Sequence, residues 1–309
     1  MENETGTSNS IKAIEFFSGI GAFAEASRKS GIVVESAFDI DIRANQTYET
    51  NFGLKPNNRN LDTIRKEQIP DAELWWMSPP CQPYTVRGNQ KDLRDPRTKS
   101  LVNLLGIFSE QKPKAVLIEN VSGFKDTDAH TLLLKTFEDT GHLVETVELD
   151  PSDFGVPMRR PRLYFIATSR GASYKPLPLP DLNAISHKIV EFVHANFGQE
   201  LLIDELSQKR YGESLHVIDA GDPESYAICF TSGYWKSFRA SGTYIRLADG
   251  RLRRFSPEEI VQLLGFSEGF KFPESLSIQA KIQLAGNSVD VRAVKYLLSG
   301  LSFEQVDSP

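Results

Sequence analysis

An apolar run that ends in two prolines and a cysteine is the feature that most constrains this chain. Residues 75–77 are Trp-Trp-Met, which is typical of a strand, and Ser78, Pro79, Pro80 and Cys81 follow directly. Because proline fixes φ and has no backbone N–H, the strand cannot continue through the proline pair. We therefore expect Cys81 on a stiff loop at the carboxyl end of a strand, where open α/β sheets bind ligands. A lone cysteine is more often a small buried hydrophobe, but these prolines favour a rigidly held, reactive thiol.

Buried strands and helices alternate along the first half of the chain. This alternation predicts a doubly wound, Rossmann-like α/β fold. Besides the run before Ser78, strands are expected at 11–17, 33–38, 114–118, 143–149 and 162–168, and helices at 18–29, 43–52, 98–111 and 129–140.

The regular alternation stops after about residue 170. The next segment is proline-rich at 176–180 and is expected to be helical around 187–210. Helical patterns return near Ser256, a candidate N-cap, and continue to about Leu301. The predicted organisation is a disordered tail at 1–10, a catalytic domain at 11–170, a small insert at 171–250, and a C-terminal segment at 251–309 that returns to the catalytic domain.

A glycine-rich turn follows the first strand. Gly19, Gly21 and Ala24 have the spacing of a turn that lets the backbone approach a cofactor, and Asp39 ends the next strand about 20 residues later. A carboxylate at that position can accept hydrogen bonds from the two hydroxyls of a ribose. The pattern favours an adenosine cofactor, and both a nicotinamide nucleotide and S-adenosylmethionine fit it. Asp62 could meet an adenine amino group, although a helix cap explains it equally well.

A second carboxylate, Glu119, ends the almost wholly apolar strand at 114–118. Burying such a group is costly unless it is paired or used. Since parallel strands end at one edge of a sheet, Glu119 and Cys81 should lie close together. Three arginines follow at 159, 160 and 162, in a turn fixed by two prolines, and they favour the binding of an anion.

Two polar segments have two interpretations each. Residues 84–98 carry four cations, among them Arg87 and Arg97, and suit either a mobile lid over an anionic substrate or a solvated loop. Residues 229–239 mix aromatic and basic side chains, which suits single-stranded nucleic acid or the core of a small all-β insert.

The composition excludes several classes of protein. The net charge of −6 argues against nonspecific coating of nucleic acid, although local patches decide binding. No apolar run has the length of a membrane span, and the polar start is unlike a signal peptide, so a cytoplasmic protein is expected. The two cysteines, at 81 and 229, give neither a disulfide framework nor zinc spacing, and no metal is expected.

Taken together, five short motifs in this order resemble the cytosine-5 methyltransferases of nucleic acids, over nearly the whole chain. The motifs are Phe-Ser-Gly-Ile-Gly at 17–21, Pro-Cys-Gln at 80–82, Glu-Asn-Val at 119–121, Arg-Pro-Arg at 160–162 and Gly-Asn-Ser-Val at 286–289.

Within that family the chain is similar to the branch that methylates tRNA. The similarity lies at 78–85, at 95–100 and in the signature tripeptide Cys-Phe-Thr at 229–231. Met158 stands where many DNA-type members have glutamine, and Tyr84 replaces a phenylalanine of the branch. The resemblance implies methylation of carbon 5 of an anticodon-loop cytosine, at position 38 in tRNA numbering, with duplex DNA as the alternative substrate. Two further alternatives are a nicotinamide-dependent oxidoreductase and a catalytically inactive binding protein of the same fold.

The resemblance also implies a role for individual residues of an enzyme that uses S-adenosylmethionine. Separately, we expect the protein to be a monomer. The implied catalytic residues are the nucleophile Cys81, Glu119 against the cytosine ring, Arg160 and Arg162. The implied cofactor-binding residues are Phe17, Gly19, Gly21, Asp39, Ile40, Asp62, Ser78, Pro80, Leu101, Asn287, Ser288 and Val289. The implied substrate-binding residues are Gln82, Asn120, Arg87, Arg97, Cys229, Phe230, Thr231, Lys236 and Arg239. The small insert would then be a target-recognition region.

Overall fold

A six-stranded sheet forms the centre of the larger lobe. The computed structural model describes residues 10–84, 92–182, 186–238 and 241–304. The strand order is β2-β1-β3-β4-β7-β5. The four strands β2, β1, β3 and β4 are parallel, whereas β7 is antiparallel to both of its neighbours, so the sheet is mixed. The strands are β1 (Ile11–Phe16), β2 (Ile32–Phe38), β3 (Leu74–Met77), β4 (Ala115–Asn120), β5 (Leu143–Leu149) and β7 (Arg162–Thr168).

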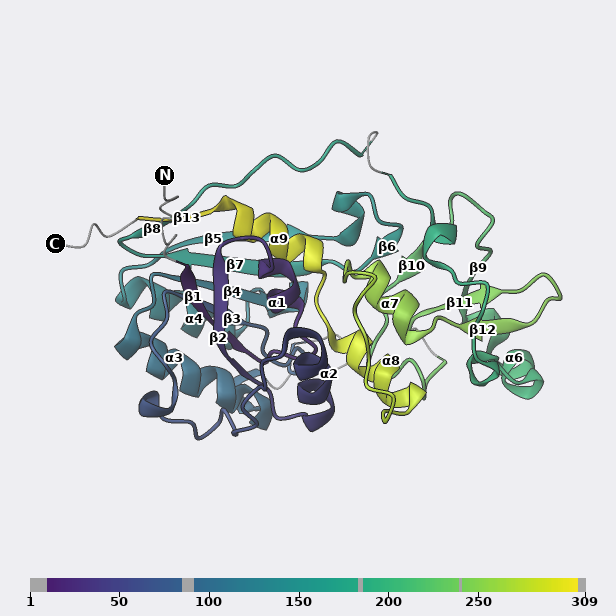
Figure 1. The fold of residues 1–309 in the computed structure, drawn as a ribbon, viewed down its shortest axis with the longest axis horizontal. Helices are drawn as coiled ribbons and strands as arrows, with labels where there is room; N and C mark the ends of the chain where they lie inside the picture. Colours follow the sequence, from purple (N-terminus) through teal and green to yellow (C-terminus); the bar gives the residue numbers. More distant parts are fainter. Residues whose placement is uncertain (1–9, 85–91, 183–185, 239–240, 305–309) are drawn as a thin grey trace, which may run out of the picture.

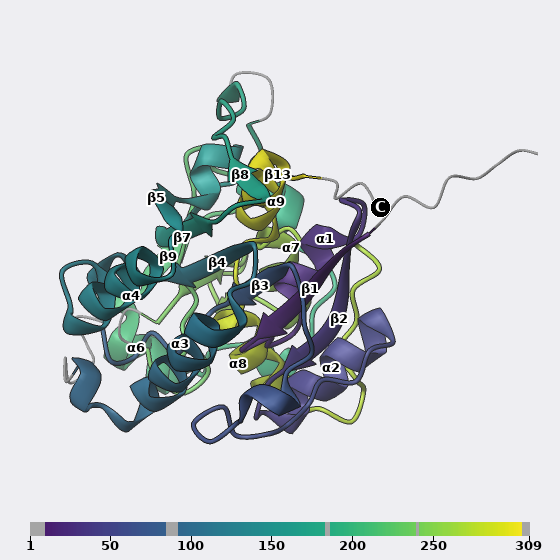
Figure 2. The same ribbon diagram turned by 90° about the vertical axis from the view of Figure 1, so that its left-hand side faces the viewer.

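Helices cover both faces of this sheet, which confirms the predicted α/β class. Figure 2 shows α3 and α4 on one side of the strands and α1 and α9 on the other. The adjacent residues Trp75 and Trp76 explain why, because successive side chains of a strand point to opposite faces. Trp75 packs with Phe108 of α3, and Trp76 stacks on Phe23 of α1. The helices are α1 (Ala22–Ser27), α2 (Ile42–Phe52), α3 (Lys99–Gln111), α4 (Asp128–Asp139) and α9 (Val291–Gly300).

Most of the remaining chain forms a smaller lobe, seen on the right of Figure 1. Its three-stranded sheet has the order β12-β11-β9, and a two-stranded ladder joins β10 to β6 next to the larger lobe. The elements are β6 (Met158–Arg159), β9 (His216–Ile218), β10 (Ala227–Ile228), β11 (Thr243–Arg246), β12 (Leu252–Arg254), α6 (Glu205–Tyr211), α7 (Pro257–Leu263) and α8 (Ile278–Asn287).

The C-terminal elements pack back onto the larger lobe. Helix α9 lies against α1, and β13 (Leu301–Phe303) pairs antiparallel with β8 (Ala172–Tyr174). One hydrophobic cluster continues from α1 and α9 into β11, β12 and α7. The domain boundaries at 170 and 250 therefore stay a prediction. Within the described part of the chain, no helix is long and apolar enough to cross a membrane.

The helix expected around 187–210 is mostly wrong. The structure has only two short 3₁₀ turns there, at Ile189–Phe192 and Gln199–Leu201, before α6 begins at Glu205. The segment instead pairs with other elements: Leu202 bridges to Arg253 of β12, and Ile203 N–H donates to the Leu252 carbonyl. Tertiary pairing has overridden the local helical preference.

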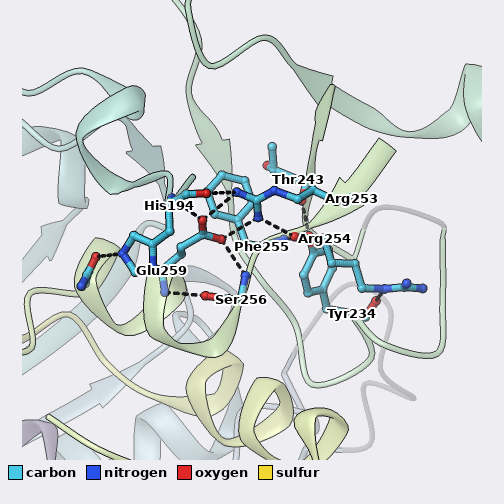
Figure 3. A network of polar contacts seen from close by, with 9 residues as sticks. His194, Tyr234, Thr243, Arg253, Arg254, Phe255, Ser256 and Glu259 are labelled. Atoms are coloured by element: carbon cyan, nitrogen blue, oxygen red, sulfur yellow. Dashed lines mark hydrogen bonds and ion pairs between the residues drawn. The ribbon is translucent and has the colours of Figure 1, made fainter. Parts of the chain in front are cut away.

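A buried ion pair joins three segments of the smaller lobe, as Figure 3 shows. Arg253 of β12 donates to Glu259 of α7 through Nη1 at 2.8 Å and Nη2 at 2.7 Å. The same carboxylate accepts from the backbone N–H groups of His194 and Ser256, each at 2.7 Å. Both charged side chains are almost wholly buried. Four donors on one carboxylate offset the cost of its burial.

Candidate active site

A pocket of about 1120 Å³ opens at the carboxyl ends of the parallel strands. Its walls come from the residues that follow β1, β2, β3 and β4, as the rule for open α/β sheets predicts. The smaller lobe closes the pocket with residues 229–232, and the loop after α8 adds residues 286–289. The predicted residues that line the pocket are Phe17, Gly19, Asp39, Ile40, Asp62, Ser78, Pro80, Cys81, Gln82, Arg97, Glu119, Arg160, Arg162, Cys229, Phe230, Thr231, Asn287, Ser288 and Val289.

Four predicted site residues lie outside this lining. Leu101 is buried in the core around α3, and Lys236 is exposed on the smaller lobe. Asn120 is buried, and its Nδ2 donates to the Pro79 carbonyl at 3.4 Å, so it ties the Cys81 loop to β4. Gly21 has φ of 91°, and an added Cβ would lie 2.3 Å from the Phe52 ring, so this glycine is required by packing. Arg87 and Arg239 fall outside the described residues, as do residues 85–91 of the segment interpreted as a lid.

One end of the pocket combines a hydrogen-bonding carboxylate with an exposed apolar side chain. Asp39 accepts from the backbone N–H of Gly19 and of Asp41, each at 2.8 Å, and keeps lone pairs for further donors. Burial raises the pKa of the Asp39 carboxyl, and these hydrogen bonds oppose the rise. Next to it, Ile40 is 68% exposed and offers an apolar surface.

Two further observations fit a polar ligand at this end. The Ser18 hydroxyl lines the pocket and is buried, yet it has no hydrogen-bond partner among the described residues. A Cβ built on Gly19 would meet nothing within 4 Å, although its φ of 52° favours glycine. The space beside this backbone is therefore open to a ligand. Asp62 lies in a turn and not at a helix start, so the alternative of a helix cap is wrong.

Glu15 is a buried carboxyl group at the pocket that the sequence analysis missed. It lies on β1, and its Oε2 accepts from the Tyr48 hydroxyl at 2.9 Å. Burial raises the pKa of Glu15 to about 8, against hydrogen bonds from Tyr48 and from the start of α1. An acidic residue inside the apolar run at 11–16 was the available signal.

Glu15 should make folding stability depend on pH. Between the ordinary pKa of 4.5 and the raised pKa of about 8, the Glu15 carboxyl keeps its proton in the native state and loses it in the unfolded state. The free energy of unfolding therefore falls as pH rises through this window, and the contribution of Glu15 is level above it. The Glu15→Gln variant should lack this pH dependence. Near pH 8 its free energy of unfolding should exceed that of the wild-type protein by a few kcal/mol, in order of magnitude. Urea unfolding at intervals from pH 5 to pH 8.5 measures it. Parallel profiles for the two proteins would contradict the prediction.

At the other end of the pocket Cys81, Glu119 and Arg162 come together. Arg162 Nε lies 3.1 Å from Glu119 Oε1. Burial raises the pKa of Glu119, although the charges of Arg162 and Arg160 act against it. Burial also raises the pKa of the Cys81 thiol, the negative charge of Glu119 adds to the rise, and the two arginines oppose it. The two acids are therefore electrostatically coupled.

Arg160 is buried and acts as a tie between distant segments. Its Nη1 donates to Cys229 Sγ at 2.9 Å and to the Phe230 carbonyl at 3.2 Å. Its Nη2 donates to the carbonyls of Gly286, at 3.2 Å, and Ser288. These acceptors are all protein atoms, so the contacts hold the segments at 229–230 and 286–288 in place. Because Arg160 also lines the pocket, its catalytic role stays a prediction.

Two residues of the tripeptide at 229–231 lie in different environments. Cys229 lies close to the positive charges of two arginines, and Phe230 lies in the hydrophobic core. Burial alone would raise the pKa of the Cys229 thiol, but the positive charges of Arg160 and Arg162 outweigh it and lower that pKa. Phe230 is 1% exposed and packs on the rings of Tyr234 and Phe255, so its ring belongs to the core and offers no stacking face.

Two backbone segments approach closely beside this tripeptide. A Cβ built on Gly286 would lie 3.0 Å from the Thr231 carbonyl oxygen, which explains the glycine of the last motif. Arg97, which lines the pocket, is held by two side-chain hydrogen bonds to the buried Asp95, at 2.8 and 2.6 Å. Among the residues described, no cluster of three or more His, Cys, Asp or Glu could hold a metal ion.

Comparison with known proteins gives consistent matches. Residues 11–210 match the family model of the C-5 cytosine-specific DNA methylases. The tRNA (cytosine(38)-C(5))-methyltransferase of Schizosaccharomyces pombe is 28% identical, over 94% of this chain and 96% of its own. A DNA (cytosine-5)-methyltransferase of Dictyostelium discoideum is 29% identical, over 94% of each chain. The solved structure of the Entamoeba histolytica methyltransferase EhMeth superposes with a TM-score of 0.84 at 28% identity, over 94% of this chain and 97% of that one.

Proposed function

The chain belongs to the C-5 cytosine-specific methylase family, and from this membership we propose that its substrate is the cytosine at position 38 of a tRNA anticodon loop. Cytosine-5 methyltransferase activity follows from the family itself. The observation that carries the tRNA assignment is the Cys-Phe-Thr tripeptide at 229–231, whose thiol Arg160 holds in the active site. The duplex-DNA alternative is favoured by the Dictyostelium relative, which is named for DNA.

S-adenosylmethionine is the proposed cofactor, and bound at the Gly19 end it would supply an electrophilic methyl group. Asp39 would accept from the ribose hydroxyls, and Ile40 would cover the adenine. The unpartnered Ser18 hydroxyl and the open space beside Gly19 support this fit. A nicotinamide cofactor would leave Cys81 and Glu119 without a role, and the family match supports S-adenosylmethionine instead.

The chemistry proposed for Cys81 begins with its addition to carbon 6 of the cytosine, which makes carbon 5 nucleophilic. A protonated Glu119 puts no negative charge beside Cys81 and so favours the thiolate. The same proton can move to the ring nitrogen as the Cys81 bond forms, with Arg162 holding the Glu119 carboxylate. Carbon 5 would then receive the methyl group of bound S-adenosylmethionine, which would leave as S-adenosylhomocysteine. A water molecule would then take the carbon 5 proton, the ring nitrogen would return its proton to Glu119, and the bond to Cys81 would break to release the thiolate.

An RNA loop also suits the energetics of reaching this pocket. The target base must leave its stack to meet Cys81, which costs a few kcal/mol in a duplex and less in a loop. The intact Cys81, Glu119 and Arg162 argue against an inactive binding protein.

Parallel transfer assays should separate tRNA from DNA. With labelled S-adenosylmethionine, the wild-type protein should label tRNA and leave duplex DNA unlabelled, because only the loop presents an unpaired cytosine. Bisulfite sequencing should place the new methyl group at position 38. Label in DNA alone would overturn the substrate and keep the chemistry, and no label in either would favour the inactive protein.

A further inference from the structure

A series of stacked cationic and aromatic side chains crosses the smaller lobe. The Arg254 guanidinium lies 4.9 Å from the ring centroid of Trp235 and 5.1 Å from that of Phe238. The Phe238 and Tyr211 rings stack with centroids 5.0 Å apart and planes 16° apart. The Arg210 guanidinium lies over the Tyr211 ring at 5.2 Å. The series therefore joins β12, the loop at 231–238 and helix α6 in one stack.

The inner end of this stack adjoins the active site. Ser232 and Ser237, which lie on either side of Trp235, line the pocket. Phe238 follows Ser237 directly, and the Tyr244 hydroxyl donates to the Ser237 carbonyl at 3.4 Å. A nucleic acid whose target base enters the pocket would therefore pass over this loop.

The outer end of the stack is an exposed face of α6. Leu206 is 79% exposed and lies one helical turn before Arg210, which is also exposed, so the two share a face. Gln208 anchors the helix, because its Nε2 donates to the Gly250 carbonyl at 3.2 Å. Lys209 adds a second exposed cation, and the exposed acids Asp204 and Glu205 lie at the start of α6, next to Leu206. The face thus combines an apolar group, a planar cation and positive charge.

We propose that Leu206 and Arg210, supported by the Tyr211–Phe238 stack, form a platform on which an unpaired nucleotide of the RNA substrate stacks outside the catalytic pocket. This proposal rests on the proposed RNA substrate. Bases in RNA loops stack on aromatic rings and on arginine guanidinium planes. Flipping the target cytosine leaves its neighbours without a stacking partner, and a cationic platform beside the pocket can replace it. A partner protein would bury more apolar surface than this one leucine offers.

The test compares variants of α6 with a matched control variant in the larger lobe, whose two positions lie on the edge strand β5 and just after β7. Leu143 is also 79% exposed, and its backbone pairs with Thr168, two residues before the exposed Arg170. Thr168 in turn pairs with the start of β4, so both control positions lie far from the carboxyl ends of the strands. The Leu206→Ser/Arg210→Ala double variant should bind an anticodon stem-loop RNA about tenfold more weakly. Its turnover at saturating RNA should stay unchanged, and the Leu143→Ser/Arg170→Ala variant should match wild type.

A conservative variant separates stacking from charge. Arg210→Lys keeps the positive charge and loses the planar group, so it should bind RNA as weakly as Arg210→Ala. Full affinity in Arg210→Lys, or unchanged affinity in the double variant, would overturn the platform. The affinity for RNA is measured in a binding assay that does not depend on methyl transfer. The affinity for the cofactor is measured separately and should not change. Failure of the wild-type protein to methylate RNA would instead overturn the proposed function, which keeps the two failures distinct.

Discussion

Replacing Cys81 by alanine should lower methyl transfer by at least about 10⁴-fold, while affinity for the cofactor stays within about twofold. The loss is large because no other described residue offers a thiol at the end of β3, where the proline pair holds Cys81. The cofactor end of the pocket, around Asp39, is built from β1 and β2 and does not depend on Cys81. Single-turnover transfer and equilibrium cofactor binding measure the two quantities separately.

A trapping experiment shows which cysteine carries the bond. RNA with 5-fluorocytidine at the target position cannot lose its carbon 5 substituent as a proton, so a covalent complex should accumulate with the wild-type protein. The complex should vanish in Cys81→Ser and persist in Cys229→Ser, because the Cys229 thiol is engaged by Arg160 at 2.9 Å. A complex that survives Cys81→Ser and is lost in Cys229→Ser would assign the nucleophile to the smaller lobe.

The site residues that follow parallel strands were predictable from the sequence. Cys81, Glu119 and Asp39 each come directly after an apolar run, and one rule on strand ends brings them to the same edge. Local sequence also places Ser256 as a helix N-cap, which the structure confirms. For such residues the position in the fold follows from the neighbours in the chain.

Residues whose roles depend on distant contacts were not predictable in this way. Arg160 was expected among the catalytic residues, but nothing near it in the chain indicates that it also bonds to carbonyls 70 and 126 residues away. The segment at 187–210 has a helical pattern, but its pairing with β12 decides its shape. Glu15 is an acid in a strand, and only the packing of Tyr48 and α1 reveals why it is tolerated.

The buried pair of Arg253 and Glu259 should have the largest effect on stability. Replacing Glu259 by leucine removes the acceptor of four hydrogen bonds and leaves the buried Arg253 charge without a partner. The free energy of unfolding should fall by about 3–5 kcal/mol. Adding Arg253→Met removes the uncompensated charge, so the double variant should be more stable than Glu259→Leu alone.

An exposed ion pair in the same lobe is the matched control for this prediction. Arg251 and Asp249 also approach to 2.7 Å, but their side chains are 55% and 51% exposed. Because water screens such a pair, Asp249→Asn should leave the unfolding free energy unchanged within error. Denaturant unfolding of the wild-type protein and these three variants gives the comparison. If Glu259→Leu were as stable as Asp249→Asn, the buried ion pair that joins β12, α7 and His194 would not stabilise the smaller lobe, and the prediction would be wrong. A loss of unfolding free energy that is confined to Glu259→Leu and recovered in the double variant would confirm the prediction. Since both ion pairs approach to 2.7 Å, their different burial would explain the difference in stability.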